Sequence, residues 1–234
     1  MKLITHRLFQ RLLSNKALSH KGYTIDQTIL IVAIIAILIT LIIVTVGWQL
    51  INRTSGTKAA AQLRQVEDAN GQFFSSQRVW PHQAFSSAAS ATAANNMRVL
   101  VDPTGTGAPA LATNIKTTEL RNLLPGFAVA SGVVTHGFGS GNGVVIQQAN
   151  SYPVAANIGT DQRMVVQFSL VPLSEAEESD EAIDGALNAT TGRVVYRATG
   201  NCLNGTAGGA APGGATVAAG TSTVTLCYAA NTVK

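Results

Sequence analysis

The stretch ILIVAIIAILITLIIVTV, residues 29–46, contains 18 consecutive uncharged residues. As an α-helix it would be roughly 27 Å long at about 1.5 Å per residue, which together with its flanks matches a bilayer core of roughly 30 Å. Trp48 follows at the position of an interfacial aromatic ring. A buried core helix is the alternative, but so long an isoleucine-rich run is rare in soluble cores. The stretch therefore predicts a transmembrane helix.

The charges of the chain are few and unevenly placed. Only 12% of the 234 residues are charged, and the formal net charge is +4. Five of the 16 lysines and arginines lie in residues 1–22, which contain no acid, so residues 23–234 carry 11 basic and 12 acidic residues, a net charge of −1. The basic leader predicts a cytoplasmic amino terminus. Because the remainder is near neutral, no nucleic-acid partner is indicated.

An ordinary secretory signal does not fit this amino-terminal layout. Such a signal has a short basic head, about 7–15 apolar residues and then a small-x-small cleavage site. Here the basic head exceeds 20 residues, and the apolar run is followed by GWQLINRTSG, which lacks that site.

The junction between leader and apolar run reads SHKGYTIDQTILIVAIIAIL, residues 19–38. It resembles the class III signal peptide of type IV pilins and related pseudopilins, and its 22-residue leader and non-phenylalanine start look more like the type IVb branch. The resemblance implies that prepilin peptidase cleaves after Lys21-Gly22 and that Tyr23 becomes the N-methylated first residue of the mature chain.

The sequence departs from this family five residues into the mature chain. The family usually has a glutamate there, which is thought to pair with a neighbouring subunit's amino terminus, whereas this chain has Gln27, preceded by Asp26. A charge pair is far stronger than a charge–amide contact at low dielectric. Either Asp26 takes over the assembly role, or Gln27 makes a weaker neutral bond, or both residues merely lie in the headgroup region.

The pattern of the remaining chain predicts an α+β fold. We expect one long helix over residues 24–78, transmembrane in its first half and amphipathic in its second, packed on an antiparallel β-sheet head. Family members share such a helix. The expected domains are a leader (1–22), a transmembrane and filament-core helix (23–52) and a periplasmic or extracellular head (53–234). Within the head we expect a loop at 82–113, a short helix at 117–124 and a sheet over about 127–229, with strand-like runs at 127–135, 143–148, 164–172, 193–197 and 222–228.

Half of the acids of the chain lie between two of these strands. Residues Ser174 and Glu177 form a capping-box pattern, which predicts a helix that Gly185 or Asn188 closes. A calcium site is one interpretation of the clustered carboxylates, but the EF-hand spacing is absent, so a solvated helix face is favoured. The segment DEAIDGALNATTGRV (180–194) also resembles a helix-to-strand element near the carboxyl end of many type IV pilins.

The chain contains two cysteines, Cys202 and Cys227. In an exported head, pairing is the default, with two free thiols as the alternative. A bridge would enclose 24 residues and contribute roughly 3–3.5 kcal/mol in the chain-entropy model. The pair resembles the carboxyl-terminal disulfide region of type IV pilins, a surface segment often involved in subunit packing. Major pseudopilins of type II secretion typically lack such a bridge.

No catalytic, cofactor or metal site is predicted, and we do not expect an enzyme. Outside the leader the histidines are His82 and His136, too few for an ordinary zinc site. The glycine-rich GFGSGNG (137–143) misses the phosphate-loop spacing and joins two strand-like runs, so it reads as a turn.

The resemblance implies a structural subunit of a type IV pilus. The prepilin would sit in the inner membrane and then move to the cell surface as part of a helical filament. Its partners would be prepilin peptidase, the inner-membrane assembly platform, lipid before assembly, and other copies of itself. The alternatives are a minor pilin or a pseudopilin of a periplasmic pseudopilus, and a membrane-anchored periplasmic enzyme or binding protein.

Overall fold

The computed structural model describes residues 24–138, 143–150, 162–203 and 213–233, without the side chains of residues 48–56, 149 and 150. The predicted leader and the processing residues Lys21, Gly22 and Tyr23 lie outside the described residues. The chain divides into two structural units between Trp48 and Gln49.

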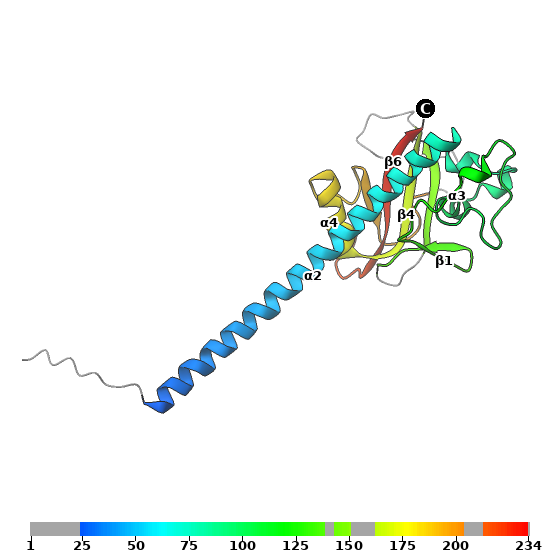
Figure 1. Cartoon of the computed structure of the whole chain (residues 1–234). Coiled ribbons are helices and arrows are strands. Elements are labelled where there is room, and N and C mark those ends of the chain that lie inside the picture. The colour runs from blue at the N-terminus through cyan, green and yellow to red at the C-terminus, as the bar shows by residue number, and fades with distance from the viewer. Residues whose placement is uncertain (1–23, 139–142, 151–161, 204–212, 234) are drawn as a thin grey trace, which may run out of the picture. The chain divides into compact units, whose positions relative to one another are not determined.

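A single helix, α2, covers Ile25–Gln77, which confirms the predicted long helix (Figure 1). It ends where the sequence predicts, because Trp80-Pro81 follows within a turn and proline cannot continue a helix. Its residues fall in both structural units.

The head is built on one antiparallel sheet, as predicted. Its six strands follow the order β1-β2-β3-β4-β6-β5. The strand from the carboxyl end of the chain, β6, therefore lies between β4 and β5 (Figure 1). The strands are β1 (Ala128–Ala130), β2 (Val133–Thr135), β3 (Gly143–Asn150), β4 (Gln162–Pro172), β5 (Val194–Arg197) and β6 (Thr223–Val233).

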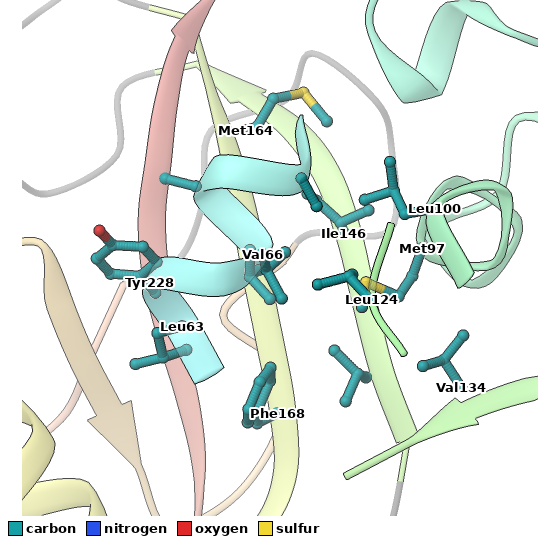
Figure 2. Packing of buried hydrophobic residues seen from close by; sticks show 14 of the residues in the cluster. Leu63, Val66, Met97, Leu100, Leu124, Val134, Ile146, Met164, Phe168 and Tyr228 are labelled. Atoms are coloured by element: carbon teal, nitrogen blue, oxygen red, sulfur yellow. The ribbon is translucent and has the colours of Figure 1, made fainter. Parts of the chain in front are cut away.

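One face of the sheet carries the main core. Alternate residues of the central strands point to it, among them Phe168 of β4 and Tyr228 of β6, both fully buried. The second half of α2 supplies Leu63, Val66 and Phe73 to the same cluster, and Figure 2 shows Leu63 and Val66 beside Tyr228. Each such side chain contributes about 1.5–3 kcal/mol when it is buried. The amphipathic period thus holds this half of the helix on the head.

Helix α3 (Ala93–Val101) corrects the prediction that residues 82–113 form a loop. Thr92 caps it by accepting a hydrogen bond from the Asn95 N–H at 3.2 Å, and Met97 and Leu100 enter the main core. Its first turn, AANN, contains two residues of low helix propensity, which conceals it in the sequence. Burial in the core, rather than local helix propensity, therefore stabilises α3.

The prediction of a short helix at 117–124 is also wrong, because only a single 3₁₀ turn, Thr117–Glu119, forms there. The Leu123 N–H bonds to the Leu100 carbonyl at 2.9 Å, and proline at position 125 disfavours helical geometry at the preceding residue. Because the Leu123 N–H is bonded to α3, it cannot make the hydrogen bond to the preceding turn that a helix would require.

Helix α4 (Leu173–Asp184) confirms the predicted helix but not its cap. It begins directly after Pro172, and Ser174 lies inside the first turn without a capping bond. The strand before it fixes this start, because the Leu173 N–H still bonds to the Ser222 carbonyl at 3.1 Å. Gly185 ends the helix in the left-handed conformation, φ +77°, as predicted.

The opposite face of the sheet holds a smaller cluster around the predicted disulfide. Cys202 and Cys227 are bonded to each other and are both fully buried, together with Val165, Val195 and Ala229. Gln167 of β4 accepts a hydrogen bond from the Cys202 N–H at 3.1 Å. The bridge therefore fastens the segment before residue 204 to the back of the sheet.

Candidate functional site

The first unit presents an apolar helix surface that no other described residue covers. Residues 24–46 are all exposed in the chain, and the isoleucines, leucines and valines among them are between 44% and 79% exposed. Within the described part of the chain, Ile25–Gly47 is the one helix that is long and apolar enough to cross a membrane. A surface of this kind requires lipid or protein around it.

The polar atoms along this surface are satisfied within the helix. Thr40 Oγ1 donates to the Ala36 carbonyl at 2.8 Å, and Thr45 Oγ1 donates to the Leu41 carbonyl at 3.0 Å. Hydroxyls bonded to the preceding turn present mainly their methyl groups outward. The stretch can therefore lie in an apolar medium without an unpaired hydroxyl at these positions.

The first turn of α2 shows what Gln27 does in the single chain. Its Oε1 accepts a hydrogen bond from the Thr24 N–H at 3.3 Å, the geometry of the reciprocal half of a capping box. The sequence signal for this bond is T-I-D-Q at residues 24–27, a threonine followed three residues later by a glutamine. Asp26, in the same turn, makes no hydrogen bond or ion pair with the described residues.

A polar cluster ties α2 to the sheet inside the head. Arg193 donates to Glu67 Oε1 at 2.8 Å and to the Tyr228 hydroxyl at 2.6 Å, and its guanidinium lies 4.8 Å from the Tyr228 ring centre. The Tyr228 hydroxyl also donates to Glu67. Burial, followed by the hydrogen bond to Glu67, raises the pKa of Tyr228, so the hydroxyl keeps its proton. The cluster joins three segments that are distant in sequence.

The acidic helix α4 is not simply a solvated face, which corrects that expectation. Asp180 is fully buried, and its Oδ2 accepts a hydrogen bond from the Asn188 N–H at 2.6 Å. Asp184 Oδ2 accepts from the Val194 N–H at 2.8 Å. Among the described residues, no group of three or more histidine, cysteine, aspartate and glutamate side chains could hold a metal ion. These two acids organise the segment that leads into β5.

No protein-family model, curated protein or solved structure matches the chain. Its function must therefore be argued from its own residues and their geometry.

Proposed function

We propose that this chain is a type IVb-like prepilin, a membrane-stored subunit that assembles into a filament through its amino-terminal helix. The observation that carries the proposal is the combination of a basic leader ending in Lys21-Gly22 with an entirely exposed apolar helix a few residues later. The well-packed head, which buries its own core, supports the same reading. A signal that is cut before its apolar run keeps that run in the mature protein.

In this proposal the helix Ile25–Gly47 serves two successive purposes. In the monomer it anchors the chain in the inner membrane. In the filament it packs against the same helix of neighbouring subunits, so that a protein surround replaces lipid and extraction need not expose the helix to water. Repeated non-closing contacts between identical subunits generate a helical filament.

Asp26 is a better candidate than Gln27 for the acidic group that pairs with a neighbouring subunit's amino terminus during assembly. The Gln27 side chain is engaged with its own helix start, at the Thr24 N–H, whereas Asp26 has no partner among the described residues. In the proposed mature chain the amino group of Tyr23 would be methylated and cationic. The carboxylate of Asp26 on a neighbouring subunit is the group that can pair with it at low dielectric.

The head would form the outer coat of the filament. The second half of α2 packs on the sheet through Leu63, Val66 and Phe73, so the head and the assembly helix belong to one continuous element. The buried Cys202–Cys227 bridge secures the carboxyl-terminal segment, as an exported head requires.

A minor pilin or pseudopilin is the second candidate, which the neutral Gln27 favours in the case that Asp26 does not supply the pairing charge. Gln27 carries no charge, and its side-chain oxygen accepts from the Thr24 N–H of its own helix, so it cannot supply the charge that the family usually places there. Purified surface filaments composed mainly of this chain would select the major-pilin reading. A chain restricted to scarce, short periplasmic assemblies would select the second candidate.

The amino terminus of the mature chain provides the decisive test. The chain would be expressed with a matching prepilin peptidase and recovered from membranes for mass spectrometry. We expect the chain to begin at N-methylated Tyr23. In a Gly22→Leu variant we expect the leader to remain attached, and Lys16→Ala serves as the matched leader control with normal processing. Residues before Tyr23 in the wild-type product, or normal shortening of the Gly22 variant, would overturn the proposal.

A further inference from the structure

The inner side of α4 holds an acidic side chain without access to solvent. Asp180 is fully buried, next to Ser179 and one turn from Ala176, which are also fully buried. A carboxylate loses its hydration on burial and needs hydrogen bonds or a positive charge in return. Asp180 Oδ2 has one strong donor, the Asn188 N–H, while its Oδ1 has no hydrogen-bond partner.

Asp184 lies one helical turn further along the same face. Residues four apart on a helix are neighbours, with about 5–6 Å between their Cβ atoms. Asp180 holds the middle of the following segment through Asn188, and Asp184 holds its end through Val194. The two carboxyl groups thus hold residues 185–194 by two hydrogen bonds, one to the Asn188 N–H and one to the Val194 N–H.

The groups around Asp180 add negative rather than positive charge. Asp184 faces it from α4, the phenol of Tyr196 faces it from β5, and Glu177 of α4 adds its negative charge near the same phenol. The nearby cations are directed elsewhere, because Arg193 binds Glu67 and Arg64 donates to the Ala182 carbonyl. No ion pair involves Asp180 or Asp184 in the described part of the chain.

We propose that Asp180 and Asp184 share one proton and form a proton-operated clasp on the segment 185–194. With the proton on Asp180, its otherwise unpartnered oxygen can donate to Asp184, and only one negative charge remains on the pair. Loss of that proton to solvent leaves two adjacent carboxylates, one of them fully buried, and the clasp loosens.

The titration of Asp180 has the direction that this clasp requires. Burial raises the pKa of Asp180 from 3.8 to about 7, the Asn188 hydrogen bond opposes this shift, and the charge of Asp184 adds to it. The closed segment therefore binds a proton that the open segment releases. Opening should become up to about tenfold more favourable for each unit that the pH rises between about 4 and 7, and should level off above that.

Amide hydrogen exchange of the full-length chain in detergent micelles tests the clasp. The Asn188 and Val194 amides are the two donors, and their protection factors, corrected for intrinsic exchange, would be measured between pH 5 and 8. We expect both factors to fall as the pH rises, while amides in the centre of the sheet change less.

Three variants separate the clasp from general effects of pH. Asp180→Asn keeps an acceptor for the Asn188 N–H but cannot ionise, so its protection should lose the pH dependence. Asp184→Asn removes the neighbouring negative charge, which lowers the pKa of Asp180, so the fall in protection should be smaller and should level off at a lower pH than in the wild type. Asp68→Asn, an exposed acid on α2, should behave like the wild type.

The outcomes decide between a proton and a metal ion. Unchanged pH dependence in both the Asp180 and Asp184 variants would overturn the proposal, and the second variant provides the test if the first fails to fold. Protection that rises with added calcium, falls with a chelator and ignores pH would replace the shared proton with a bound cation, and would equally overturn it. None of these results depends on leader processing, so the proposed function stands or falls separately.

Discussion

At the residue scale, Arg193 makes more long-range hydrogen bonds than any other side chain among the described residues. It bonds to Glu67 and to the Tyr228 hydroxyl, and it also donates to the Ala229 and Ala230 carbonyls at 3.1 and 3.2 Å. A planar guanidinium can satisfy several acceptors at once, which a lysine ammonium cannot do with the same geometry. The sequence does not single out this arginine, because its partners lie more than 30 residues away.

Replacing Arg193 with alanine should therefore destabilise the head by about 2 kcal/mol, because Glu67 is left half-buried without its cation. Urea unfolding followed by near-ultraviolet circular dichroism measures the loss. Arg193→Lys should recover only part of the stability. Arg121→Ala, at an exposed arginine, should change it by less than about 0.5 kcal/mol. Equal effects of the Arg193 and Arg121 substitutions would contradict this role.

His136 should make the head less stable in acid. Its Nε2 lies 2.6 Å from the Ser169 carbonyl, and its Nδ1 accepts from the Phe138 N–H at 3.1 Å, an arrangement that fits the neutral ring. Burial lowers the pKa of His136 below 6.5, although the bond to Ser169 opposes the shift. The unfolded chain thus takes up the proton first, and stability falls as the pH drops below about 6.5.

Imidazole signals in a nuclear magnetic resonance titration would check this expectation. The His136 ring should stay neutral at pH values where a free histidine is already protonated. A His136→Gln variant should lose part of the acid sensitivity relative to the wild type. Since burial also lowers the pKa of His82, the comparison is made in a His82→Gln background. A normal titration of His136 in the folded chain would contradict the argument.

At the element scale, the long helix shows what a sequence pattern can predict. Its apolar half, its amphipathic half and its end before Trp80-Pro81 all follow from residue type and period. Helix α3 shows the limit, because AANN gives little local preference and Met97 and Leu100 become helical only through the core they join. The buried position of Asp180 was hidden for a related reason, since a helix dense in acids does not reveal which one faces inward.

A charge in the middle of the apolar helix should weaken membrane anchoring. Ile34→Asp places a carboxylate where it costs about 2.5–3.5 kcal/mol on insertion scales. We expect a larger share of the chain to be released by alkaline carbonate extraction. Ile34→Leu, at the same position, should remain in the membrane fraction. Full retention of the aspartate variant would argue against a spanning helix.

At the scale of the whole molecule, the α+β class, the antiparallel sheet and the cysteine pair were predictable from the sequence. The strand order was not, because β6 enters between β4 and β5 through contacts that no local pattern encodes. The candidate assembly residues were predictable only as alternatives. The structure adds one fact about them, the hydrogen bond from the Thr24 N–H to Gln27 Oε1.

Loss of the bridge should weaken the whole head. Cys202→Ser with Cys227→Ser should lower the free energy of unfolding by about 3 kcal/mol in the chain-entropy model. Because both cysteines are fully buried, alkylation after mild reductant should require denaturant as well. Gel mobility with and without reductant gives the readout, and Ser222→Ala, just before β6, serves as the control. Ready alkylation of the native chain would contradict the buried bridge.

The interior position of β6 also determines when, during synthesis, the head can complete its fold. Its residues follow β4 and β5 in the chain, yet they fill the gap between these two strands and cover Leu63 and Val66, which are made more than 150 residues earlier. The head therefore cannot complete its core until β6 has been synthesised and has joined the sheet. Until then the exposed core surface depends on protection from outside, and removal of the last strand should leave a permanently incomplete domain rather than a smaller one.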